Sequence, residues 1–172
     1  MAKGSVGKFA LRIAACWIVM IALDLLLNAG AFAKLWFEPG PFLLGPEDLF
    51  RRLPLGYTAF LLQATAYVWL ANHMGVKSAR QGALFGLKLG VILGVAAALG
   101  LRSGTTASWT ILLVAWLIGG TVLTTGAGFM AGFSCEHGEK RALLSALLLL
   151  VGAVIVISIL QSTGLAPARR IG

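Results

Sequence analysis

Residues 82–101 read GALFGLKLGVILGVAAALGL, a run in which Lys88 is the only charged residue. A helix that crosses a bilayer needs about 20 mostly apolar residues, so this run predicts a transmembrane span. Glycines recur at every fourth position within it, at Gly82, Gly86, Gly90 and Gly94. On a helix these positions form one ridge without side chains. Because glycine costs a helix about 1 kcal/mol relative to alanine, the ridge predicts a close contact with a second helix.

The partner expected for this glycine ridge is the next apolar segment, residues 108–133. That segment also has small residues at which two backbones can approach, at Gly119, Gly120, Gly126, Gly128 and Gly132. Lys88 lies two residues from Gly86 and from Gly90, about 200° around the helix from the ridge. Its side chain is therefore expected either to extend to the near interface or to meet a different helix.

Apolar segments of spanning length recur along the whole chain. Of the 172 residues, 59% are hydrophobic and only 12% are charged, about half the charged share of an ordinary soluble domain. The expected spans are residues 9–33, 55–72, 82–101, 108–133 and 142–161. The sequence thus predicts an all-α polytopic transmembrane bundle that forms one domain over residues 1–172, with five spans, or four as the alternative.

The first span has a second interpretation, because basic residues precede it and the small residues AGAFA at 29–33 resemble a signal-peptide cleavage site. Asp24 interrupts the apolar region, so we expect a retained span. The connection at 34–54 is too apolar for a solvated loop, and its prolines prevent one continuous helix. We expect it to lie in the membrane interface, with a short helix at 46–53. An interfacial bracket over the bundle is the favoured interpretation, and a gating lid is the alternative.

The net charge of +8 is spread over the ends and connections of the spans. That distribution does not form the single basic stripe of a nucleic-acid-binding protein and suits anionic lipid headgroups. With five spans, the N-terminus and the turns at 74–81 and 134–141 share one side of the membrane. The basic residues are nearly balanced between the two sides, so the first helix decides, and we expect a cytoplasmic N-terminus.

Polar residues within the expected spans are the main functional candidates. Asp24 lies near the middle of the first span, with Asn28 one helical turn later. Counting depth along each helix places Gln63 and Tyr57 of the second span near these two residues. Lys88 is a further candidate as a counter-charge. The cluster could bind a proton or small cation, or it could be a polar clamp that fixes the register of two helices.

A metal site has little support in the sequence. The segment CEHGE at 135–139 shares a side with His73 in the five-span arrangement, so the candidate ligands are His73, Cys135 and His137. Zinc needs three or four converging ligands, whereas neighbours on a tight turn point in different directions. We expect a solvated polar turn, no metal and no cofactor. No nucleophile elbow, P-loop or dinucleotide motif indicates an enzyme.

The residues AFAKLWF at 31–37, which end the first span, and GALFG at 82–86, which open the third, carry a family resemblance. The chain resembles small bacterial multi-span membrane proteins of the "domain of unknown function" kind. The resemblance implies a bacterial inner-membrane protein and transfers no activity or site residue. Such families usually have four spans, so a fifth is a departure.

Two functions are therefore expected from the sequence. The first is a structural or accessory subunit that packs against other membrane subunits or against copies of itself, which fits the glycine ridge and the absence of a chemical motif. The alternative is a small proton, cation or solute carrier built on the cluster around Asp24.

Overall fold

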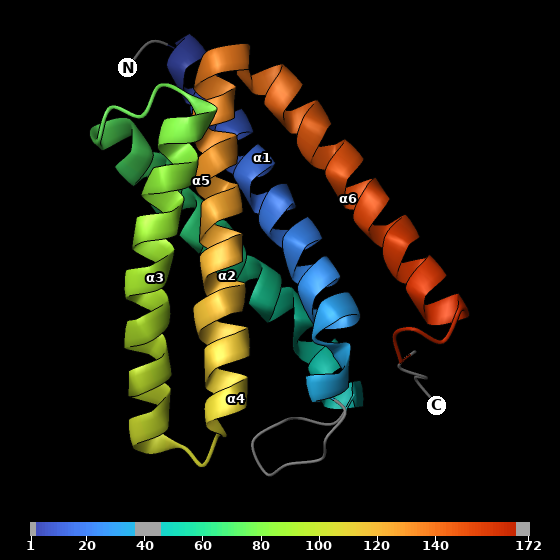
Figure 1. Ribbon diagram of the computed structural model, residues 1–172. Coiled ribbons are helices and arrows are strands. Elements are labelled where there is room, and N and C mark those ends of the chain that lie inside the picture. The colour runs from blue at the N-terminus through green and yellow to red at the C-terminus, as the bar shows by residue number, and fades with distance from the viewer. Residues whose placement is uncertain (1–2, 37–45, 168–172) are drawn as a thin grey trace.

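A computed structural model describes residues 3–36 and 46–167 (Figure 1). In order, its elements are α1 (Lys3–Leu25), the π-helix η1 (Leu26–Ala31), the 3-10 turn η2 (Ala33–Trp36), α2 (Pro46–His73), α3 (Ala79–Gly104), α4 (Trp109–Ile111), the π-helix η3 (Leu112–Gly119), α5 (Gly120–His137) and α6 (Glu139–Ser162). Over these ranges the chain contains helices and turns but no strand, which confirms the all-α class.

Four of the helical segments are long and apolar enough to cross a membrane. They are Val6–Ala31, Ala79–Gly104, Trp109–His137 and Glu139–Ser162. Only 17% of the most apolar window of the last segment is buried inside the chain. So much uncovered apolar surface suits lipid and not water.

The second expected span, 55–72, lies within α2, which is not among these four apolar helices. The short helix expected at 46–53 is not a separate element, because it forms the beginning of α2 and runs on through Pro54. A proline removes one backbone donor from a helix without necessarily ending it. Residues 37–45 lie outside the described ranges, so the interfacial placement of 34–54 stays a prediction.

The helices alternate in direction, so that α1, α3 and α6 begin at one end of the bundle, where α2 and α5 finish (Figure 1). We call this the N-terminal end. α3 lies beside α5, α6 lies beside α1, and α2 runs obliquely behind the others. The main core contains buried residues from α1, α2, α5 and α6, among them Cys16, Met20, Val68, Ala127 and Ala146.

The predicted contact of the glycine ridge is confirmed. All four ridge glycines and Ala98 are buried; α5 covers Gly82, Gly86 and Gly90, and the preceding π-helix η3 covers Gly94. A Cβ built on Gly82 would overlap the backbone of Gly128, lying 2.9 Å from its carbonyl carbon. A Cβ on Gly86 would meet the backbone of Thr124 in the same way, again at 2.9 Å from the carbonyl carbon. The two backbones therefore touch at positions where only glycine fits.

The partner ridge differs in part from the prediction. Gly128 and Gly132 face α3 as expected, but Gly126 faces Leu23 of α1. A Cβ on Gly119 would lie nearest to the carbonyl oxygen of Val114 in its own helix, and one on Gly120 would meet nothing within 4 Å. Thr124 occupies the place opposite Gly86 and Gly90, because a small β-branched side chain also permits a close approach.

Candidate functional site

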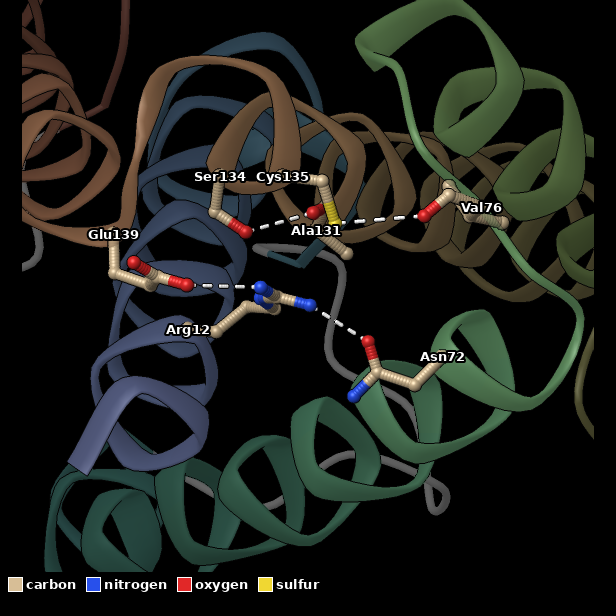
Figure 2. Close-up of polar contacts among 7 residues, drawn as sticks. All are labelled: Arg12, Asn72, Val76, Ala131, Ser134, Cys135 and Glu139. Atoms are coloured by element: carbon tan, nitrogen blue, oxygen red, sulfur yellow. Dashed lines mark hydrogen bonds and ion pairs between the residues drawn. The ribbon is translucent and has the colours of Figure 1, made fainter. Parts of the chain in front are cut away.

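Two groups of polar side chains are the candidates for a functional site. The first is a group at the N-terminal end formed by Arg12, Asn72 and Glu139, which we call the Arg12 cluster (Figure 2). The second is the pair Asp24 and Asn28 near the other end of α1.

Arg12 of α1 joins three helices. One terminal nitrogen of its guanidinium donates to Oδ1 of Asn72 in α2 at 2.6 Å, and the other donates to Oε1 of Glu139 in α6 at 2.9 Å (Figure 2). The side chains of Arg12 and Glu139 are only 16% and 15% exposed. A guanidinium has several N–H donors in a rigid plane, so it can bond two partners at once. A single residue therefore holds the last turn of α2 and the first turn of α6 against α1.

Contacts beside the Arg12 cluster involve the remaining long helices, α3 and α5. The backbone N–H of Ala79, the first residue of α3, donates to Oε2 of Glu136 in α5 at 3.0 Å. The thiol of Cys135 lies 3.4 Å from the carbonyl oxygen of Val76, between α2 and α3 (Figure 2). All the long helices are thus cross-linked by polar groups at this end.

Sequence reasoning treated Arg12 as one of several basic residues that flank the first span, and Glu139 as part of a turn. The missed signal was the position of Arg12 within the apolar run that begins at Phe9. A cation inside a span needs a partner. In the five-span arrangement Asn72 and Glu139 end and begin spans on the same side as Arg12, which makes them the candidates.

Asp24 and Asn28 form a direct contact at the end of α1. Nδ2 of Asn28 donates to Oδ1 of Asp24 at 2.6 Å, and both residues are half-buried. Nearby, Nε1 of Trp17 donates to the backbone oxygen of Tyr57 at 2.8 Å. Of the five predicted residues of the polar cluster, Asp24 and Asn28 therefore contact each other.

Gln63 and Lys88 do not join them. Both are exposed on the outside of the chain, and within the described ranges no ion pair links Lys88 to Asp24. Depth counting placed Asn28 level with Tyr57, whereas Trp17 is the residue of α1 that contacts it. The count assumed parallel axes, and α2 is oblique to α1 (Figure 1).

The three candidate metal ligands have other contacts. The ring of His73 stacks on Trp69, and that of His137 stacks on Phe133 with centroids 4.3 Å apart. The expected turn at 135–139 is wrong, because α5 continues to His137 and ends at Gly138, whose φ of +89° favours glycine. Among the residues that the structure describes, no group of three His, Cys, Asp or Glu could hold a metal ion.

Comparisons with protein-family models, with curated proteins and with solved structures give no match.

Proposed function

We propose that this chain is a bacterial inner-membrane protein that crosses the bilayer five times and serves as a helix-packing subunit of a membrane assembly. Four crossings are the long apolar helices, and α2 is the additional one. Its 28 residues give a length of about 42 Å, so it spans the ~30 Å hydrocarbon core even when tilted by up to about 40°. The oblique course of α2 in Figure 1 supports this. So do its ends, where Arg51 and Arg52 lie near the beginning and Asn72 and His73 lie at the finish.

The number of crossings can be tested with single cysteines at positions that follow α1 and α3. Lys34→Cys and Ser103→Cys, each in a Cys135→Ser background, place thiols at two exposed positions. If α2 crosses, a membrane-impermeant maleimide modifies both from the same side of the membrane. Modification from opposite sides would show that α2 remains on one side, which leaves four crossings.

The observation that carries the assembly role is the outer face of α2. Gly56, Ala59, Gln63 and Ala66 are exposed at helical spacing on one side of this helix, and a Cβ added at Gly56 would meet nothing within 4 Å. Small residues with one amide are typical of helix–helix interfaces in membranes. An uncovered glutamine in mid-helix would otherwise face hydrocarbon, which costs free energy.

The assembly can be measured by native mass spectrometry of the full chain from mild detergent. We expect a defined complex with another membrane protein or with copies of the chain. Ala59→Leu and Ala66→Leu should dissociate it, because a larger side chain separates the helices. Ala96→Leu, at an exposed alanine of α3, is the matched control and should leave the complex intact. A stable monomer of the unmodified chain would reject the proposal.

A second candidate, a proton or cation carrier, is favoured by the Asp24–Asn28 contact. Asp24 lies two residues before the π-helix η1, and π-helical turns occur frequently at functional sites. The test is flux into liposomes that contain the purified chain. Asp24→Asn should abolish a pH-driven flux while the fold persists. Equal flux with and without the acid, or no flux in either, would assign Asp24 to a polar clamp between helices.

A further inference from the structure

The outer face of α3, on the side away from the glycine ridge, combines exposed cations with an exposed apolar strip. Lys77 directly precedes the N-cap Ser78, Arg80 lies in the first turn, and Lys88 lies in the first half of the helix; all three cations are exposed. Around and beyond Lys88 the same side of the helix bears uncovered aliphatic residues, namely Leu84, Val91, Ile92, Val95 and Leu99.

These three cations have no acidic partner within the described part of the chain. Glu136 is the acidic side chain that reaches the start of α3, and its Oε2 accepts the N–H of Ala79. The backbone N–H of Lys77 donates to Oε1 of Gln81 at 3.0 Å. Gln81 lies two turns before Lys88 on the same side of the helix. This contact therefore holds Lys77 on the same side as Lys88, nearer to the start of the helix. The positive charge on this face is uncompensated.

The depth of Lys88 in the membrane determines which group can neutralise its charge. The 26 residues of α3 measure about 39 Å and exceed the ~30 Å core by a few ångströms at each end. The Cα of Lys88 then lies about 10 Å inside the hydrocarbon. Its side chain points towards the start of the helix and reaches about 6 Å. The ammonium therefore stops just beneath the headgroup level, below Lys77 and Arg80, where it needs an anion.

We propose that this face binds one anionic phospholipid, with its phosphate held by Lys77, Arg80 and Lys88 and an acyl chain lying on the aliphatic strip. The part of the strip from Leu84 to Ile92 is about 12 Å long and lies within the ~15 Å of the leaflet that holds Lys77, Arg80 and Lys88. A single carboxylate from a neighbouring helix would satisfy Lys88 and leave the two cations at the helix start unpaired. The inference rests on the membrane placement of α3 and not on the assembly through α2.

The test compares two lipids with identical dioleoyl chains, phosphatidylglycerol and phosphatidylcholine, titrated into the delipidated full chain in neutral detergent and followed by native mass spectrometry. We expect preferential binding of phosphatidylglycerol. Lys88→Met keeps the length of the side chain and removes the charge. It should weaken that binding about five-fold, since a cation near an anionic headgroup contributes about 1 kcal/mol. Lys88→Arg should retain the binding.

Lys140→Met is the matched control, because Lys140 is an exposed cation at the same end of the bundle but on α6. It should leave the affinity for phosphatidylglycerol unchanged. Equal binding of the two lipids, or an equal loss in both methionine variants, would overturn the proposal. So would a carbodiimide cross-link in native membranes between the amine of Lys88 and a carboxylate of a protein, which would show that a partner helix covers this face.

Discussion

Single glycines decide how closely α3 and α5 approach. Gly86→Ala should destabilise the fold by about 3 kcal/mol, because the new Cβ would overlap the backbone at Thr124, which has no flexible end to move. Gly100→Ala in the same helix should stabilise it by up to about 1 kcal/mol, since a Cβ there meets nothing within 4 Å. Unfolding of both variants in detergent with increasing dodecyl sulfate measures the difference. Equal midpoints would show that the ridge does not set the contact.

The Arg12 cluster allows a second measurement on individual residues. Arg12→Met should lower the free energy of unfolding by about 1–3 kcal/mol, because it removes two hydrogen bonds from a charged donor and leaves Glu139 little exposed and unpaired. Glu139→Gln should cost less. A double-mutant cycle between the two positions should give a favourable coupling. Coupling near zero would show that the pair contributes no more to stability than an ordinary exposed surface ion pair.

At the residue scale, sequence patterns predicted spacing well and partners less well. The four-residue period of the glycines determines which side of α3 is buried, because a helix has a fixed geometry. No such period links Arg12 to Asn72 and Glu139, which are far apart in the chain and meet through the topology. The exposed positions of Gln63 and Lys88 likewise depend on the direction of α2 and on which helices pack against α3.

At the level of elements, the two π-helices are expected to be the least protected parts of the long helices. At the end of η1 the N–H of Phe32 donates to the oxygen of Leu27, five residues back, at 2.6 Å, and η3 covers Leu112–Gly119. We expect amide hydrogens in Leu26–Ala31 and Leu112–Gly119 to exchange about ten-fold faster than those in α1 and α5, which corresponds to about 1.4 kcal/mol. Hydrogen exchange with mass spectrometry in detergent measures this. Uniform protection along each helix would contradict it.

The lengths of most elements followed from apolar runs, but their ends and directions did not. Lipid requires a run of about 20 apolar residues, which is why the four long apolar helices were predicted nearly in place. Polar residues can extend a helix beyond the bilayer, and α5 therefore continues through Cys135 to His137 until Gly138 ends it. The continuity of α2 through Pro54 and its oblique course arise from packing against α1 and α5, which no local pattern encodes.

For the whole molecule, the distribution of basic residues predicts which end of the bundle faces the cytoplasm. The five-span arrangement places Lys8, Lys77, Arg80, Lys140 and Arg141 at the N-terminal end, and all are exposed. Arg12 lies at the same end, but its guanidinium already donates to Asn72 and Glu139. Basic residues close to span ends favour the cytoplasmic side, and the first helix usually dominates. We therefore expect the N-terminal end in the cytoplasm.

The native cysteines provide the measurement for this orientation. Cys135 is exposed at the N-terminal end, whereas Cys16 is buried, where its thiol donates to the backbone oxygen of Ala127. A membrane-impermeant maleimide should label the chain in inside-out vesicles but not in intact spheroplasts, and Cys135→Ser should remove that label. Ser103→Cys in this background should restore labelling with the opposite sidedness, because α3 ends at the other face. Labelling of Cys135 from outside the cell would contradict this prediction. It would show that the basic N-terminal end of the bundle faces outwards.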